Sequence, residues 1–275
     1  MSVYIKNKVN TDILPDHKIS DKENLAHYTI DKILNGYDSI DLDSINAVNF
    51  MKRIDKKYTF HIQHLGTLLE QLKDDYMVLE INKQRKMLYM TQYFDTPDKT
   101  LYLNHHNKKL NRFKVRKRKY AVSGVTFLEV KFKNNKGVTN KSRIKSSSNL
   151  SVIPVKDHEF LKEHTNLTAL QLKPGLFNQF NRITLIDKHF TQRLTIDTSV
   201  VFVYKDRYKR MENLVIMETK SSDYKANKKM QDTLHRYKIY PDGFSKYCIG
   251  TALLSESAKK NAFKEKIRKI NAMLM

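Results

Sequence analysis

Residues 111–145 read NRFKVRKRKYAVSGVTFLEVKFKNNKGVTNKSRIK. Charged and apolar residues alternate along three runs of this stretch, and turn-forming residues separate the runs at Ser123-Gly124 and at 134–137. Because successive side chains of a β-strand point to opposite faces, each run has a charged face and an apolar face. We therefore predict three consecutive antiparallel strands, which span residues 111–120, 125–133 and 138–145.

The same stretch carries much of the charge imbalance of the chain. From Lys108 to Lys145 there are 14 Lys and Arg residues and a single acid, Glu129. The whole chain has 51 Lys and Arg residues against 29 Asp and Glu residues, which gives a net charge of +22. A cationic excess that is concentrated in one segment indicates an anionic partner: a nucleic acid, a membrane surface or a phosphorylated molecule.

Charged faces recur on at least six predicted strands. The residues that share such faces are Arg53, Asp55 and Lys57; Arg116, Arg118 and Tyr120; Glu129, Lys131 and Lys133; Lys141, Arg143 and Lys145; Arg193, Thr195 and Asp197; and Glu218 and Lys220. In an ordinary half-buried sheet these faces would lie in solvent. A sheet of this size with helices on its apolar face tends instead to curl into a barrel. Its buried cations would then require a bound polyanion to offset their desolvation.

The remaining segments complete one α+β domain. Helical periodicity predicts helices at 21–37, 61–75, 98–107, 224–238 and 244–257, with one or two more within 146–176. Strand patterns predict further strands at 53–60, 87–98, 180–187, 192–204 and 214–220. The tail, 262–274, has one apolar helical face, which predicts a helix that docks on the domain. Binding of this tail to an anionic membrane is the weaker alternative.

Several sequence features narrow the compartment and the chemistry. No apolar run approaches the about 20 residues of a membrane span, and the N-terminal sequence lacks the apolar stretch of a secretory signal. A single cysteine, Cys248, excludes an internal disulfide framework and a cysteine-based zinc site. The expected compartment is therefore the cytoplasm. The sequence has no P-loop motif and no serine or cysteine nucleophile motif, and the pairs His105-His106 and His61/His64 fit solvated helix residues better than metal ligands.

Eight short motifs occur in order along the chain. They are Arg53-x-x-x-Lys57-Tyr58; Tyr93-Phe94-Asp95; Arg116-x-Arg118-x-Tyr120; Phe127-x-Glu129-x-Lys131; Lys141-x-Arg143; Asn181-Arg182 followed by Arg193-x-x-x-Asp197; Glu218-x-Lys220; and Phe244-Ser245-Lys246. Over about residues 50–255 this order resembles the polyphosphate polymerase domain of the vacuolar transporter chaperone (VTC) family, which belongs to the triphosphate tunnel superfamily, also called CYTH.

The resemblance implies a fold and an activity. The fold is an antiparallel, closed or nearly closed β-barrel (the triphosphate tunnel fold) with a cationic lumen and flanking helices. The chain would then comprise an N-terminal helical extension (1–48), the tunnel domain (49–255) and a C-terminal amphipathic helix (256–275). The activity is transfer of the γ-phosphate of ATP, or of another nucleoside triphosphate, to a growing polyphosphate chain inside the tunnel.

The resemblance also assigns roles to single residues. The residues expected to act on the transferred phosphate are Lys57, Arg116, Arg118 and Lys246. Those expected to bind the phosphate chain are Arg53, Lys131, Lys141, Arg143, Arg182, Arg193 and Lys220. Glu218 is the first candidate ligand for Mn²⁺ or Mg²⁺, with Glu129 and Asp197 as second candidates. Salt bridges are the alternative role for Arg116, Arg118 and Glu218, and plain surface exposure is the alternative for the other cations.

Two departures from the family pattern bear on the activity. Gly243 stands where the eukaryotic members carry a lysine, so one phosphate contact is missing or comes from a neighbour such as Lys238. The hydrolytic branch of the superfamily opens with Glu-x-Glu-x-Lys, whereas residues 53–57 carry one carboxylate, Asp55, which favours synthesis.

Other functions remain as alternatives. One is a hydrolase of triphosphate or short polyphosphate. Another is a non-catalytic module that binds polyphosphate or, less favoured, RNA through aromatic residues such as Tyr93, Phe94 and Tyr120. A membrane partner protein is a further open interaction.

Overall fold

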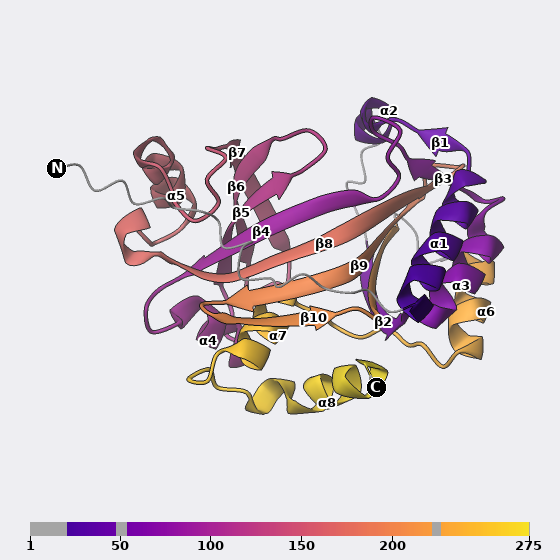
Figure 1. Ribbon diagram of the computed structural model, residues 1–275. Coiled ribbons are helices and arrows are strands. Elements are labelled where there is room, and N and C mark those ends of the chain that lie inside the picture. The colour runs from indigo at the N-terminus through magenta and orange to yellow at the C-terminus, as the bar shows by residue number, and fades with distance from the viewer. Residues whose placement is uncertain (1–20, 48–53, 222–226, 275) are drawn as a thin grey trace.

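The computed structural model describes residues 21–47, 54–221 and 227–274 (Figure 1). Its centre is an 11-stranded sheet with helices packed on it, an α+β architecture. Eight strands follow one another across the sheet, each antiparallel to its neighbours. In spatial order they are β2 (Ile54–His61), β11 (Leu214–Ser221), β9 (Gln192–Tyr204), β8 (Lys173–Asp187), β4 (Met87–Asp95), β5 (Arg112–Tyr120), β6 (Thr126–Lys133) and β7 (Thr139–Lys145).

Three short strands extend this sheet, and the sequence patterns did not predict them. The strands β10 (Arg207–Met211) and β3 (Tyr76–Leu79) pair antiparallel with β9 and β8. The two-residue strand β1 (Ser39–Ile40) pairs parallel with β3. Strands this short contain too few residues for the alternation of polar and apolar side chains to become distinctive.

The sheet is curved, and its strand pairs contain bulges. The pairing of β8 with β9 shifts register between Gln179 and Asn181, and Ser199, opposite this shift, has a positive φ of 49°. The pairing of β4 with β8 shifts between Gln92 and Phe94. Because bulges bend a strand and increase its twist, β5, β6 and β7 stand steeply across the direction of β8 and β9 (Figure 1).

The prediction of a closed or nearly closed barrel is not confirmed. Within the described ranges, β2 and β7 end the sheet and do not pair with each other. The loop before helix α7 (Lys246–Leu254) lies along the outer edge of β2, where the Asp242 amide donates a hydrogen bond to the Lys57 carbonyl at 2.6 Å. The other edge, β7, carries the exposed charged residues Lys141, Arg143 and Lys145, which are typical of a strand that resists further pairing.

Three helices cover the apolar face of β2, β11, β9 and β8. They are α1 (Asp21–Asn35), α3 (Leu65–Leu72) and α6 (Lys228–Arg236), and their buried residues share one core with those strands. The predicted helical face of 61–75 is confirmed, since Leu65, Leu69 and Leu72 are fully buried. In α1, Leu25 and Tyr28 have the same helical spacing as its buried residues but are 66% and 69% exposed. They lie in the N-terminal half of a helix whose C-terminal half makes the core contacts.

A second group of helices packs on the opposite face of the sheet, the face to which Ile216 points. It comprises α4 (Thr100–His106), α7 (Lys246–Leu254) and α8 (Lys264–Leu274). At Gly250 in α7, an added Cβ would meet side-chain atoms of Leu176 and Phe202 at 2.6 and 2.7 Å, so glycine allows this helix to approach the sheet. In α8, Ile270 is buried in the same core, with Phe263, Ile267 and Leu274 partly buried beside it. The tail helix therefore docks on the domain.

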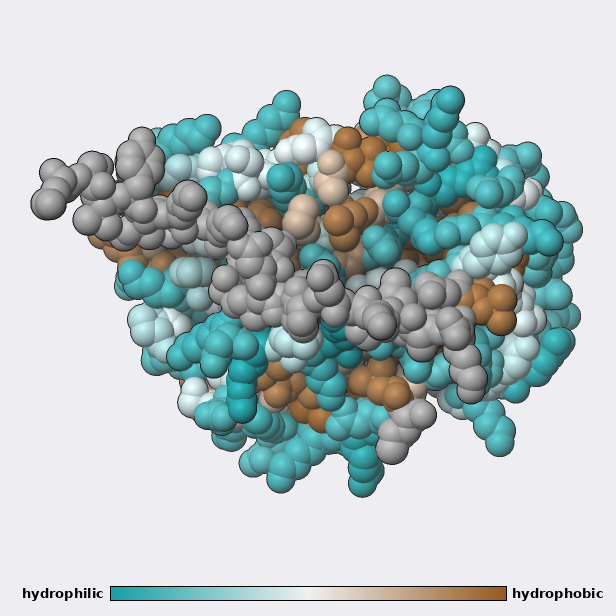
Figure 2. Space-filling model, in the orientation of Figure 1, coloured by the Kyte–Doolittle hydropathy of each residue, from teal (hydrophilic) through white to brown (hydrophobic). Residues whose placement is uncertain are grey.

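The remaining helices are short. Helix α5 (His158–His164) covers the apolar face of β5 and β6, and α2 (Leu42–Ala47), which the sequence patterns did not predict, lies beside β1. Hydrophilic residues cover most of the face shown in Figure 2. In the part of the chain that the structure describes, no helix is long and apolar enough to cross a membrane.

Candidate functional site

The strand registers place the predicted charged faces on the same side of the sheet. Arg116 lies opposite Glu129, and Glu129 lies opposite Arg143. Near the other edge of the sheet, and on the same face, Glu218 lies opposite Lys57. We call this surface the cationic face. Its charged residues include Asp55, Lys57, Lys114, Arg116, Arg118, Glu129, Lys131, Lys141, Arg143, Arg182, Arg193, Asp197, Glu218 and Lys220, joined by Lys246 from the start of α7.

The curvature brings distant strands of this face together electrostatically. The pKa of Lys131 on β6 lies well below its usual value, first because of the Arg116 charge and then because of burial and Arg118. Glu218, which lies on β11, acts on the same ammonium group in the opposite direction. Four strands lie between β6 and β11 along the sheet. Lys131 and Glu218 are therefore within electrostatic reach of each other across the cationic face.

Each of three carboxylates on this face contacts two cations. Arg182 holds Asp197 through two hydrogen bonds, at 2.6 and 2.7 Å, and Lys246 contacts the same carboxylate. Arg116 and Lys141 contact Glu129 at 2.6 and 2.5 Å. Lys57 and Lys220 contact Glu218 at 3.0 and 3.3 Å. The salt-bridge alternative therefore describes Arg116 and Glu218 in this structure.

These contacts keep the carboxylates ionised despite their burial. Burial alone would raise the pKa of Glu129, but Arg116, with Arg118 and Lys141, outweighs it and holds that pKa well below its usual value. Lys220 and Lys57 do the same for Glu218, and Arg182 and Lys246 for Asp197. Their negative charge is thus already neutralised by the protein.

Two cations, the buried Arg118 and the half-buried Lys131, are not neutralised in this way. Arg118 is 7% exposed, and its Nε donates a hydrogen bond to the Thr91 hydroxyl at 3.1 Å. Among the residues described, neither Arg118 nor Lys131 forms an ion pair with a carboxylate. Burial, followed by repulsion from Arg116, lowers the pKa of Arg118. These two cations therefore carry positive charge that the carboxylates of the cationic face do not pair with.

Aromatic rings support the guanidinium groups. Arg118 lies 5.5 Å from the ring centre of Tyr89 and 5.7 Å from that of Phe180, and Arg182 lies 5.0 and 5.2 Å from the same two rings. The Lys246 ammonium lies 4.3 Å from the Phe180 ring centre. Such contacts favour cations and hold these side chains in place without cancelling their charge.

The Phe-Ser-Lys motif positions Lys246 at one end of the cationic face. Ser245 caps α7, since its hydroxyl accepts a hydrogen bond from the Cys248 amide at 3.3 Å. The same hydroxyl accepts a hydrogen bond from the Lys114 ammonium at 3.0 Å. The sequence analysis did not include Lys114 among the site residues, although Lys114 lies on the same face of its strand as Arg116 and Arg118. Lys238, considered as a substitute for the lysine missing at Gly243, is exposed just after α6, a helix that packs on the opposite face of the sheet.

The other predicted residues differ in where they lie. Arg193 and Lys220 lie on the cationic face near the ends of their strands, with Arg193 opposite Lys220. Arg143 is exposed and lies over the Phe127 ring at 4.6 Å. Arg53 lies outside the described residues. His105 is structural, since its ring contacts the Phe113 carbonyl and accepts a hydrogen bond from Arg112 at 3.0 Å.

The carboxylates offer one place for a divalent cation. No group of three His, Cys, Asp or Glu residues that could hold a metal ion occurs in the described segments. Two-point pairing with an arginine leaves Asp197 without a free oxygen, and Glu129 is fully buried between Arg116 and Lys141. Glu218 is 21% exposed and contacts only lysines, so its carboxylate could share a metal ion with phosphate oxygens.

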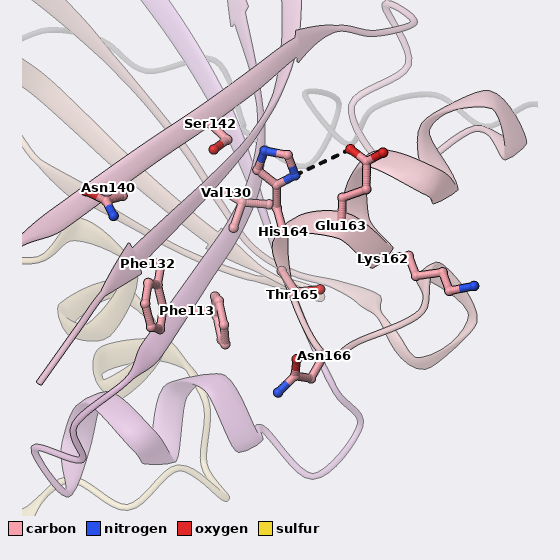
Figure 3. Close-up of a pocket in the computed structure, with 10 residues that line it drawn as sticks. All are labelled: Phe113, Val130, Phe132, Asn140, Ser142, Lys162, Glu163, His164, Thr165 and Asn166. Atoms are coloured by element: carbon pink, nitrogen blue, oxygen red, sulfur yellow. Dashed lines mark ion pairs between the residues drawn. The ribbon is translucent and has the colours of Figure 1, made fainter.

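A separate pocket of about 360 Å³ lies on the opposite face of β5, β6 and β7 (Figure 3). Phe113 and Phe132, stacked 4.7 Å apart, line one side, and the end of α5 lines the other. It contains none of the residues of the cationic face.

The fold and the site together define an α+β protein whose curved antiparallel sheet presents a buried excess of positive charge on one face. The chain belongs to the VTC domain family, whose model matches residues 52–255. The resemblance drawn from the eight motifs is thereby confirmed, and this membership supports a function related to polyphosphate or triphosphate. No curated protein sequence matches the chain.

Several solved structures are similar in fold. A Hippeastrum protein, described as a candidate adenylyl cyclase with a dominant triphosphatase activity, is 14% identical, with a TM-score of 0.47 over 74% of this chain and 96% of that one. A candidate adenylate cyclase from Bacillus halodurans is 15% identical, with a TM-score of 0.44 over 71% and 96%. The Pct1 RNA triphosphatase of S. pombe is 8% identical, with a TM-score of 0.31 over 94% and 91%. These three are too distant to indicate an activity for this chain.

Proposed function

We propose that this protein is a polyphosphate polymerase that transfers the γ-phosphate of ATP to the end of a polyphosphate chain bound on the cationic face. The proposal rests above all on two cations that form no ion pair with a carboxylate of the described residues, the buried Arg118 and the half-buried Lys131. Family membership agrees with it, since the matched residues 52–255 include the cationic face.

The physical argument concerns desolvation. Moving a cation out of water costs several kcal/mol unless an opposite charge compensates for it. Arg116, Arg182 and Lys246 have carboxylate partners, whereas Arg118 lies among them without one. A linear phosphate anion would supply the missing charge to several cations at once, because its negative charges repeat along its length. A neutral ligand would leave the excess charge uncompensated.

The side chains provide the geometry for phosphoryl transfer. Arg116 and Arg118 lie two residues apart on β5 and point to the same side, so they could bind successive phosphates. The free Nη atoms of Arg118 and the ammonium of Lys131 would bind the oxygens that gain charge in the transition state. In the reaction, a terminal oxygen of the chain forms a bond to the γ-phosphorus of ATP. The bond from that phosphorus to the β–γ bridging oxygen breaks, and ADP leaves with the electron pair.

Glu218 would hold the divalent cation together with phosphate oxygens, and Mn²⁺ and Mg²⁺ both suit such oxygen ligands. When bound, the ion would neutralise charge on the phosphates. Lys57 and Lys220, which contact Glu218 directly, would then be free to bind phosphate as well. Glu129 and Asp197 would act differently, by orienting Arg116 and Arg182.

The residues at the start of β2 favour synthesis of polyphosphate over hydrolysis. Asp55 is the carboxylate of this strand, is 37% exposed and lies 4.0 Å from Lys220. A hydrolase requires a group that positions and activates water, and a second carboxylate beside Asp55 would provide it. In the Glu-x-Glu-x-Lys pattern of the hydrolytic branch that carboxylate stands at position 53, where this chain has Arg53.

Incubation of the protein with ATP and Mn²⁺, followed by separation of the phosphate products, tests the proposal. A polymerase yields ADP and long acid-labile phosphate chains. Orthophosphate as the main product would establish a hydrolase. Tight binding of polyphosphate without turnover would establish a binding module, and both results would contradict the proposal.

A further inference from the structure

We infer that Phe127, Tyr120 and Arg143 form a stacking site for the base of a nucleotide whose phosphates lie on the cationic face. The three side chains meet on the same face of β5, β6 and β7. We call them the aromatic platform. The inference rests on the proposed function, because it names the part of the nucleoside triphosphate that the cations do not bind.

The platform is built from contacts between flat groups. The guanidinium of Arg143 lies 4.6 Å from the ring centre of Phe127. The Tyr120 ring meets Phe127 edge-on, at 5.9 Å and 89°, and Tyr89 continues the row at 4.8 Å from Tyr120. Phe127 and Tyr120 are partly exposed and Arg143 is exposed, so a planar ring can reach them.

Arg143 is held by this stacking and not by an ion pair. Its partner position across the strand pair is Glu129, but Arg116 and Lys141 occupy that carboxylate. In the described part of the chain, no carboxylate forms an ion pair with Arg143. A guanidinium that stacks on one ring can release that ring or stack on a second one, since its planar face accepts aromatic partners.

The position of the platform matches the shape of a nucleotide. Phe127 lies directly opposite Arg118, the buried cation without a carboxylate partner. Adjacent strands are about 4.8 Å apart, so the Phe127 side chain starts one strand spacing from that of Arg118, whose guanidinium lies by the Tyr89 and Phe180 rings on the side away from β6. A ligand whose phosphates lie on the cations and whose planar ring reaches the neighbouring platform is a nucleotide, because its ribose holds the base away from the phosphates. Stacking on an aromatic side chain accepts every base but is strongest for the larger purines.

Inorganic tripolyphosphate provides the test, because it carries the phosphates of ATP without the base. Dissociation constants would be measured by titration calorimetry for ATP and for tripolyphosphate, without added metal so that no turnover occurs. We expect Phe127→Leu to raise the Kd for ATP about tenfold, which corresponds to about 1.4 kcal/mol. The Kd for tripolyphosphate should stay within about twofold of the wild-type value. The preference for ATP over UTP should also decrease in this variant.

Two further variants make the test sharper. Phe132→Leu changes a partly buried phenylalanine of the same strand that points to the opposite face, into the pocket of Figure 3, and should leave both constants unchanged. Tyr120→Leu removes the second ring of the platform at a partly exposed position without changing a charge, so it should weaken ATP binding and spare tripolyphosphate even if Phe127→Leu folds poorly.

The outcomes separate the inference from the proposed function. Unchanged ATP affinity in both platform variants, or a parallel loss for ATP and tripolyphosphate, would overturn the platform alone. Failure of tripolyphosphate to bind the wild-type protein would overturn the proposed function, and the platform with it.

Discussion

Replacement of Arg118 by methionine should stabilise the unliganded protein while weakening its binding of phosphate chains. The side chain is 7% exposed, and its charge is opposed by burial and by Arg116. Exchanging a buried, uncompensated charge for an apolar side chain of similar length removes a desolvation cost. The loss of one hydrogen bond to Thr91 offsets part of the gain. We expect a net increase of about 1 kcal/mol in the free energy of unfolding, or about 2–4 °C in Tm.

Arg116→Met is the matched control, because it changes the same residue type two positions away on the same strand face. Arg116 contacts the fully buried Glu129 at 2.6 Å, so its loss leaves that carboxylate with Lys141 alone. Breaking a buried pair costs about 3 kcal/mol or more, which corresponds to a decrease in Tm of about 6–12 °C. The two substitutions should therefore shift Tm in opposite directions.

Differential scanning calorimetry without ligand measures the stability changes, and titration with tripolyphosphate measures the binding. A charged hydrogen bond contributes about 1.5–3 kcal/mol, so Arg118→Met should raise the Kd for tripolyphosphate about 10- to 100-fold. A clear drop in Tm for Arg118→Met, equal to that of Arg116→Met, would refute the argument. It would mean that Arg118 has a stabilising partner in the unliganded protein.

Three further predictions concern the metal ligand, the anion and pH. Glu218→Gln keeps the side-chain shape and removes its charge, so turnover of ATP with Mn²⁺ should fall by orders of magnitude while tripolyphosphate binding persists; wild-type turnover would end the metal assignment. Tripolyphosphate at 100 times its Kd should stabilise the fold by about 2.7 kcal/mol, and salt should weaken this effect by screening; no Tm shift at low salt would contradict anion binding. Burial lowers the pKa of His105 to about 3, whereas the unfolded value is about 6.5; the unfolded chain thus binds a proton that the folded chain does not, and stability should be lost as pH falls through this window. In urea titrations His105→Gln should lose less stability than the wild type between pH 6.5 and 4, and parallel losses would show that His105 does not titrate in this way.

The convergence of the charges was predictable from the sequence because it depends only on strand parity. Arg116, Glu129 and Glu218 alternate with apolar residues, and any register that buries those apolar residues puts the charges on the opposite face. The family was also predictable from the sequence, because each of the eight motifs is short and their order can be read directly along the chain. The roles of the individual site residues stay predictions.

The sequence could not decide whether the sheet closes into a barrel, because closure depends on contacts between segments that are far apart in the sequence. The Asp242 amide binds the edge of β2 at the Lys57 carbonyl. The pairing of β8 with β9 contains a bulge at Ser199 of β9. Neither feature has a distinct pattern in the sequence. The same holds for the choice between Arg116 and Arg118. They are alike in sequence, yet only Arg116 reaches a carboxylate of the described chain, because only it lies opposite Glu129.

The division of labour among the cations also required the structure. Lys114 shares its face with Arg116 but was not among the expected site residues, and its contact with Ser245 links β5 to the start of α7. The contacts of Tyr89 and Phe180 with the cations could not be predicted from the sequence either, since aromatic residues on strands are most often core residues.

A crystal structure of the protein with tripolyphosphate and Mn²⁺ tests the central claim most directly, because it locates the anion. The account predicts phosphate oxygens about 3 Å from the guanidinium of Arg118 and the ammonium of Lys131, with the metal ion bound by Glu218 and phosphate oxygens. An anion that binds instead to the exposed lysines of α8, with Arg118 and Lys131 still without an anionic partner, would contradict it.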